Sequence, residues 1–379
     1  MDKLGWLPIG FVGLIIVMVL TNQLSTIRLR KKLAKAWEGK PFFIKKDSEE
    51  SLAETMLLAS TLQPTDSQVD GQTWHDLDLY RVFDQLNYTQ SSIGAEALYQ
   101  KMRLIKFQPD ASLQELEDFF DHHPDLRLKV QVVMNQLGKK NHNMARSIVA
   151  NPGKQDSRIY LSLYLFLACL PVFALFFLPF FKIQAMMVLV ASATFNIIFS
   201  SIRNWSNKMR LDQVSYLVRI FASAEKLSHL AIPKQEALKQ AVQPFKKTKV
   251  ISGILQSPTG SSEMEIILIY LNFLFLIPQI AQVYIYHQVR IHQKEAQEAI
   301  NLLGELEVAI SLLRHKRDVD LVCHPSFKQE VGIKGKGIYH PLLTDPVAND
   351  VRFEKNMVIS GDNASGKSTY LKMVAINCI

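Results

Sequence analysis

The sequence predicts a multidomain chain with a mostly α-helical core and transmembrane helices, followed by the start of an α/β domain. Three features of its 379 residues support this fold class. Long uncharged apolar runs, of the length that crosses a bilayer, alternate with segments of ordinary polarity. The polar segments repeat apolar residues at helical spacing. After residue 320 the chain changes to short apolar pieces punctuated by glycine, which is typical of strands joined by turns.

The overall charge of the chain favours anionic partners. Its formal net charge is +8, which suits either phospholipid headgroups or nucleic acid, and composition does not choose between the two. The three cysteines, Cys169, Cys323 and Cys378, lack the paired spacing of a disulfide framework or a zinc site. We therefore expect free thiols in a reducing compartment.

The N-terminal segment 1–46 is predicted to be a membrane anchor with a basic juxtamembrane flank. Residues 4–20 carry no charge and are close to the minimum length for crossing a hydrocarbon core. A cleaved signal peptide is the alternative, but only Lys3 precedes the run and no small-residue cleavage pattern follows it. The basic residues of the flank are Arg28, Arg30, Lys31, Lys32, Lys35, Lys40, Lys45 and Lys46. They put the N-terminus outside and the following chain in the cytoplasm. The basic run could lie on anionic headgroups or touch nucleic acid, and we favour headgroups because the run is tethered next to the membrane.

The next segment, 47–158, is predicted to be the first part of a helical core. Within it, residues 76–94 indicate two helices joined by a polar turn, with Thr89 or Ser91 available as the N-cap of the second. Residues 111–137 continue the helical pattern.

One cluster in this segment could suggest a metal site. Asp121, His122 and His123 are adjacent in the sequence. No second cluster at metal-ligand spacing accompanies them. We therefore interpret them as a solvated face or the end of a helix.

Residues 159–202 are predicted to form a transmembrane hairpin. Two uncharged runs, 159–181 and 183–202, are separated by Lys182 alone. A charge at the centre of a span costs about 2.5–3.5 kcal/mol, so the lysine marks a turn on the far side of the membrane. The chain then returns to the cytoplasm at Arg203. A buried core helix is the alternative for either run.

The segment 203–320 is predicted to be the second part of the helical core, and it contains a third apolar run at 266–286. A crossing there would put the basic soluble segments outside, against the charge bias of the first anchor. We therefore expect a largely buried or membrane-adjacent helix, with an extra span as the alternative. The run also contains several polar or helix-breaking residues, Asn272, Pro278, Gln279 and Gln282.

The stretch 357–370 carries the most informative motif. It predicts an apolar strand, then Gly361-x-x-x-x-Gly366-Lys367-Ser368, then a helix, which is a phosphate-binding P-loop in its usual context. The glycines let the backbone curl so that successive N–H groups face the β-phosphate, and the helix adds the positive end of its dipole. Lys367 would reach the β- and γ-phosphates of ATP, and the Ser368 hydroxyl would hold Mg²⁺. The alternative is a turn that binds nothing.

Three segments occur in order around this loop: GIYHPLL at 337–343, VANDV at 347–351 and VISGDNASGKSTYL at 358–371. In this order they resemble the MutS family of DNA mismatch repair ATPases, which carries His-Pro, Ala/Pro-Asn and Gly-x-Asn-x-x-Gly-Lys-Ser-Thr-Tyr elements. More loosely, 76–102 resembles the opening of that family's helical core. Residues 299–312 resemble the long helix that leads into its ATPase domain.

The resemblance implies roles for individual residues and partners for the chain. The phosphates of ATP would be bound by Gly361, Asn363, Ala364, Ser365, Gly366, Lys367, Ser368 and Thr369. Ser368 would also hold Mg²⁺, and Val347 would contact the adenine. Segment 321–379 would be the start of the ATPase domain, through which the full-length protein would form a homodimer. DNA is the further expected partner.

Several features depart from the family pattern. Asp362 stands where the family has proline, and Pro346 stands where an aromatic residue often stacks on the base. No mismatch-reading domain with a Phe-x-Glu wedge precedes the core, and the apolar hairpin interrupts it near the position of the DNA clamp. The chain stops eleven residues after Ser368, without the acidic strand-end residue of Walker B or a signature loop. We therefore identify no catalytic residue and expect hydrolysis only in the full-length form.

The predicted function is a membrane-anchored, MutS-like ATP-binding protein that switches conformation with ATP and binds DNA, with mismatch recognition itself doubtful. It would lie in the cell membrane as a multi-pass protein, with its soluble domains and ATP site in the cytoplasm. Two alternatives remain open. One is an ABC-type transporter half, which also places membrane helices before a P-loop. The other is a non-catalytic membrane scaffold.

Overall fold

The computed structural model describes residues 6–39, 45–62, 67–108, 110–152, 158–247, 270–319, 321–323, 325–326, 328 and 330–379, and the side chains of 6–19, 22, 59–62, 158 and 204–212 fall outside that description. The chain is 71% helical with only small sheets, which confirms the mostly helical character predicted from the sequence. It divides into two compact units. Unit 1 comprises 1–45 and 123–303, and unit 2 comprises 46–122 and 304–379.

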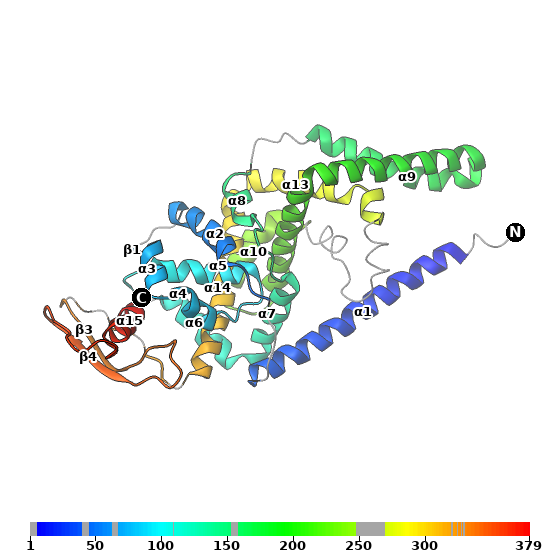
Figure 1. The fold of residues 1–379 in the computed structure, drawn as a ribbon. Helices are drawn as coiled ribbons and strands as arrows, with labels where there is room; N and C mark the ends of the chain where they lie inside the picture. Colours follow the sequence, from blue (N-terminus) through cyan, green and yellow to red (C-terminus); the bar gives the residue numbers. More distant parts are fainter. Residues whose placement is uncertain are drawn as a thin grey trace. The chain divides into compact units, whose positions relative to one another are not determined.

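All regular elements among the described residues of unit 1 are helices (Figure 1). Its elements are α1 (Trp6–Trp37), α7 (Pro124–Leu137), α8 (Ala145–Ala150), α9 (Arg158–Ser228), α10 (Gln235–Val242), the 3-10 turn η1 (Gln243–Phe245), α13 (Ile277–Ile291) and the start of α14 (Gln293–Asp318). The C-terminal half of α1 packs on α7. The Arg127 guanidinium lies 3.7 Å from the centroid of the Trp37 ring, and Gln136 Nε2 donates to Thr26 Oγ1 at 3.1 Å.

The helix α9 folds back on itself within residues 159–203, as Figure 1 shows. The Tyr164 and Phe199 ring centroids are 6.1 Å apart, and Arg203 donates to the Tyr164 hydroxyl at 2.7 Å. Further along, Asn196 Nδ2 donates to the carbonyl oxygen of Leu167 at 2.8 Å. Tyr164 contacts Phe199 and Arg203, whereas Leu167, further along the first limb, contacts Asn196, which is earlier on the second limb. The two limbs therefore run antiparallel. We call this segment the α9 hairpin.

Ile159–Arg203 is the one segment, among the residues described, that is long and apolar enough to cross a membrane. Only 17% of its most apolar window is buried in the protein. The predicted first span at 4–20 lies largely outside the description: its backbone is helical from Trp6, but its side chains are not described before Leu20.

The third apolar run is not one unbroken helix where the structure describes it, from residue 270 onward. A turn at Phe275 and Leu276 interrupts it, and Leu276 has a positive φ of 51°. The new helix α13 then begins with Pro278 in its first turn, where a missing N–H does no harm. This segment packs against the α9 hairpin, since Gln279 Nε2 donates to Ser200 Oγ at 2.9 Å.

Unit 2 combines helices with two small sheets. Its elements are α2 (Glu49–Leu62), β1 (Ser67–Gln68), α3 (Gly71–Asp76), α4 (Leu79–Leu86), α5 (Ser92–Arg103), β2 (Leu104–Ile105), α6 (Ala111–His122), the remainder of α14, β3 (Ile333–Ile338), β4 (Asn349–Phe353) and α15 (Lys367–Cys378). The helices share one core, in which Tyr99 packs edge-on against Trp74 and Phe83. Val308 of α14 and Ile376 of α15 belong to the same core.

The two helices predicted within 76–94 are confirmed as α4 and the start of α5. Ser91 is the N-cap of α5, and its hydroxyl accepts from Gly94 N at 3.2 Å. The interpretation of the acidic and histidine cluster as a helix end is also confirmed. His122 ends α6, and Asp121 pairs with Arg317 at 2.7 Å. Across the described chain, no group of three or more His, Cys, Asp or Glu side chains could hold a metal.

The α/β part of the fold is smaller than predicted. β3 and β4 form an antiparallel pair, with Ile333 opposite Phe353 and Gly335 opposite Val351. The strand expected at 357–360 does not form, because no other described strand lies beside it to accept its hydrogen bonds. Its Val358 side chain is 95% exposed. A parallel mononucleotide-binding sheet is therefore absent from the described residues.

Candidate functional site

The glycine-rich loop at 361–366 forms a tight turn directly before α15. Ser365 N donates to the Asp362 carbonyl at 3.2 Å, which closes the turn. Ala364 and Gly366 both have positive φ values, of 65° and 88°. A side chain at position 366 would be strained in this conformation, which favours glycine there. A Cβ on Gly361 would come within 2.9 Å of Ser365 Oγ, so this glycine allows the close approach of the loop's two ends.

The Lys367 ammonium lies inside the curve of this loop. Its Nζ donates to the carbonyl oxygens of Gly361 and Asp362, both at 2.5 Å, and lies 3.4 Å from Ser365 Oγ. All three of these acceptors are neutral, so the lysine is available to exchange them for a more strongly charged acceptor. The arrangement therefore presents one cation at the centre of a backbone turn.

The first turn of α15 supplies further donors. The first helical hydrogen bond runs from Tyr370 N to Gly366 O at 2.9 Å. The N–H groups of Lys367, Ser368 and Thr369 come before that bond and so have no acceptor within the helix. Together with the helix dipole they favour an anion at this end. The predicted loop residues Gly361, Asn363, Ala364, Ser365, Gly366, Ser368 and Thr369 are all exposed and Lys367 is half-buried.

These groups fit the triphosphate of ATP and its magnesium ion. The backbone N–H groups and the Lys367 ammonium are donors only, as a phosphate chain requires. The exposed Ser368 hydroxyl is a hard oxygen beside them, of the kind that Mg²⁺ takes together with phosphate oxygens. One group opposes the fit, because the exposed Asp362 side chain brings a negative charge into the loop.

Two sets of contacts hold α15 in unit 2. On one face, Met373 and Val374 pack with Val351 of β4. On another, Ile376 joins the helical core, and Lys372 Nζ lies 3.2 Å from Asp78 Oδ2 at the start of α4. The helix that carries the loop is thus in contact with both the β3–β4 pair and the helices α3 to α5.

The residues of the two flanking motifs lie next to α15. Asn349 Nδ2 donates to the Val347 carbonyl at 3.0 Å and lies 3.9 Å from Met373 Sδ. Val347 itself is 77% exposed. The predicted adenine contact therefore presents an open apolar side chain.

His340 is a buried member of the first flanking motif. Its Nδ1 accepts from Leu342 N at 3.3 Å in the turn that contains Pro341. Burial lowers the pKa of the imidazole, and the nearby Lys372 lowers it further. The neutral ring therefore stabilises the turn, which is a structural role.

No protein-family model matches the chain, and no solved structure matches it at a significant level. The resemblance to MutS proteins stays an inference from the residues of the loop and its flanks.

Sequence reasoning missed the residues that connect α15 to the helices. Lys372 and Ile376 are four positions apart, so helical spacing predicts that they share a face. Their partners could not be predicted, because Asp78 lies 294 positions from Lys372. Asn377, which donates to the Tyr339 carbonyl at 3.0 Å, was missed for the same reason.

Proposed function

We propose that this chain is a membrane-anchored, MutS-like ATP-binding protein in which ATP drives a conformational switch. The observation that carries the proposal is the Lys367 ammonium inside the 361–366 loop at the start of α15. ATP would exchange its β- and γ-phosphate oxygens for the two carbonyls that now hold Lys367. The N–H groups of the first turn would bind the same phosphates, and Ser368 would hold Mg²⁺.

The contacts of α15 support a switch rather than simple storage of nucleotide. When Lys367 leaves the loop carbonyls, the first turn of α15 must adjust to the phosphates. Lys372 and Ile376 lie on the same helix and contact the start of α4 and the helical core. ATP binding would therefore alter the α3–α4 turn, in which Asp78 already has a positive φ of 53°.

The α9 hairpin supports placement in a membrane. Its outward side chains are apolar on both limbs, among them Phe166, Phe176, Phe180, Met187 and Ile198, each more than half exposed. A contiguous apolar surface of this extent is unusual on a protein surrounded by water. The α9 hairpin would cross the bilayer twice, with Lys182 at the turn on the far side and the ATP site in the cytoplasm.

The basic part of α1 supports contact with anionic headgroups next to the membrane. Arg28, Arg30, Lys31, Lys32 and Lys35 are exposed, whereas Leu33 between them is buried. The helix thus packs one face on the protein and leaves its charges outward, where phosphates attract them.

DNA is the second anionic partner that the net charge of +8 supports. We expect binding through the helical core within 203–316. If phosphates dominate that binding, affinity for duplex DNA should fall steeply as salt rises. Absent or salt-independent binding would remove DNA from the proposal and leave the ATP site unaffected.

The ATP site is tested by equilibrium binding of ATP with Mg²⁺ to the purified chain in detergent. Loss of a charge-assisted hydrogen bond costs about 1.5–3 kcal/mol, so Lys367→Ala should weaken binding about tenfold or more. Lys336→Ala is the matched control, since Lys336 is an exposed lysine of β3 outside the loop. Equal affinity in the wild type and Lys367→Ala would reject the site.

A further inference from the structure

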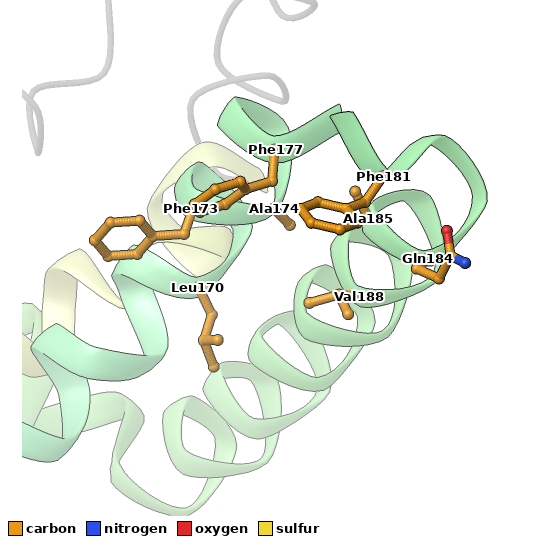
Figure 2. A pocket seen from close by; sticks show the side chains of 8 residues that line it. All are labelled: Leu170, Phe173, Ala174, Phe177, Phe181, Gln184, Ala185 and Val188. Carbon is orange, nitrogen blue, oxygen red and sulfur yellow. The ribbon is translucent and has the colours of Figure 1, made fainter. Parts of the chain in front are cut away.

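A cavity of about 340 Å³ lies between the two limbs of the α9 hairpin, near its turn (Figure 2). The first limb contributes Phe173 and Phe177, and the second contributes Ala185 and Val188. Its volume is within the range of small-ligand sites, roughly 300–1,000 Å³. The cavity lies well away from the phosphate-binding loop in the sequence and belongs to unit 1, not unit 2.

Two small residues create this space. Ala174 and Ala185 both line the cavity, and they are only 5% and 6% exposed. A methyl group at each position leaves room that a larger side chain would fill. The ring centroids of Phe177 and Phe181 lie 6.2 Å apart and form one aromatic wall.

The lining selects an apolar ligand. Gln184 is its one polar side chain, and Figure 2 shows its amide pointing away from Phe173 and Phe177. The outer surface nearby is also apolar, with Phe176, Phe180 and Met187 exposed. An apolar chain can therefore enter the cavity without crossing a polar barrier.

A cation occurs between two lining residues in the sequence. Lys182 is exposed, directly follows Phe181 and stands two positions before Gln184, and both of these residues line the cavity. An ammonium next to an apolar slot complements an amphiphile that has a negatively charged head and a hydrocarbon tail.

We propose that this cavity binds one acyl chain of an anionic lipid, with the headgroup at Lys182. The proposal rests on the membrane placement of the α9 hairpin argued above. Binding at this position would fill the space between the limbs and hold them at a fixed separation.

The test uses the purified full chain in detergent and a fatty acid with a photoreactive diazirine near the end of its chain. Cross-linked peptides are identified by mass spectrometry. We expect saturable labelling concentrated within 170–188. The fatty alcohol with the same diazirine should label the same residues more weakly, and Lys182→Gln should remove most of this difference.

Filling the cavity provides the decisive variant. Ala185→Phe should lower labelling several-fold, and Ala174→Leu is a milder second filling in case the first fails to fold. Val190→Phe is the matched control, because Val190 is exposed on the same limb and does not line the cavity. Helical content and gel filtration show whether each variant is folded.

Two outcomes would overturn the proposal. One is labelling spread over 159–203 in proportion to exposure and unchanged by either filling. The other is a cross-link between two copies at 170–188 that excludes the fatty acid, since the occupant would then be a second chain. Extraction of membranes with alkaline carbonate tests the membrane placement separately. Release of a chain that still labels within 170–188 in detergent would reject that placement but not the cavity site.

Discussion

The Asn196 side-chain amide donates to the backbone carbonyl of Leu274 at 2.9 Å, across the contact between the α9 hairpin and the segment before α13. The same nitrogen donates to the carbonyl of Leu167 at 2.8 Å. Each carbonyl stands four residues before a proline, Pro278 and Pro171 respectively. Pro171 lies inside α9 and has no N–H, so the Leu167 carbonyl cannot receive its usual helical hydrogen bond. The helical turn that contains Leu274 ends before α13 begins, so the Leu274 carbonyl also lacks a helical donor. One amide replaces both missing donors.

Replacing this amide should destabilise the packing of 270–291 on the α9 hairpin. Asn196 is fully buried, and Asn196→Leu would remove the donor from two part-buried carbonyls. A buried polar group left unpaired costs about 1–3 kcal/mol. We expect a lower melting temperature in detergent and faster proteolysis near Phe275.

A double-mutant cycle separates this effect from a general packing defect. Pro171→Ala restores an N–H to the Leu167 carbonyl, so it should reduce the cost of Asn196→Leu. An unchanged cost in the Pro171→Ala background would contradict the assigned role of the amide.

The Glu307 carboxylate of α14 should contribute to the stability of unit 2. Glu307 Oε1 accepts from Gln90 N at 2.6 Å, and its other oxygen contacts the Ser91 hydroxyl at the start of α5. A buried carboxylate at a helix N-terminus stabilises the unpaired N–H groups there. We expect Glu307→Ala to lower the free energy of unfolding by about 1–3 kcal/mol, measured by thermal or denaturant unfolding.

Gly94 supplies an independent check of this contact. A Cβ at position 94 would come within 2.7 Å of the Glu307 side chain, so Gly94→Ala should destabilise unit 2 although alanine favours helices. Glu298→Gln is the control for α14, because Glu298 is exposed on that helix. A neutral Gly94→Ala would show that the close contact is not maintained in solution.

Acid should destabilise unit 2 through its histidines. Burial lowers the pKa of both His340 and His315 from the ordinary value of 6.5. At His340 the cations Lys372 and Arg81 lower the pKa further, against an opposing effect of Asp78. As pH falls below 6.5, these histidines take up protons in the unfolded chain before they do so in the folded chain. The folded state therefore loses stability between pH 6.5 and the lowered pKa of the folded chain.

The measurement is the melting temperature between about pH 8 and pH 5. His340→Gln and His315→Gln should each flatten the acid side of the profile. A profile that stays equally steep in the double variant would assign the acid sensitivity to other groups.

Asp362 should weaken nucleotide binding. Its charge lies within the loop that would hold the phosphates, and two unit charges about 4 Å apart in water interact by about 1 kcal/mol. Asp362→Asn should therefore tighten ATP binding roughly fivefold, with a smaller change for ADP because it carries less charge. Equal ATP affinity before and after the substitution would mean that the carboxylate points away from the bound phosphates.

Local patterns in the sequence were sufficient to predict several parts of the fold. The Ser91 cap follows from a polar residue before an apolar helical repeat, and the helix after Lys367 follows from the glycine-rich turn and the apolar residues behind it. These features depend on residues close in the chain. The predicted strand at 357–360 failed because a strand also needs a neighbour, and an apolar run of four residues does not show whether one is present.

Relationships between distant residues could not be predicted. In the sequence, Asn272, Pro278 and Gln279 are departures from a membrane span. In the structure the helix breaks at Leu276, so Pro278 falls in the first turn of α13. The Asn196 amide supplies a hydrogen bond to the Leu274 carbonyl before the break. Glu307, which bonds the groups at the start of α5, lies 216 positions after Ser91. No local spacing indicates such a pair, because the contact is made by packing of whole helices.

Hydrogen exchange at the α3–α4 turn tests the central claim, that ATP in the 361–366 loop changes the helical part of unit 2. Amide exchange is measured for the full chain in detergent with Mg²⁺, with and without saturating ATP, in the wild type and in Lys372→Ala. We predict slower exchange in the loop of both proteins, and an ATP-dependent change around Asp78 in the wild type that is much smaller in Lys372→Ala. Protection of the loop with no change around Asp78 in either protein would contradict the proposed switch.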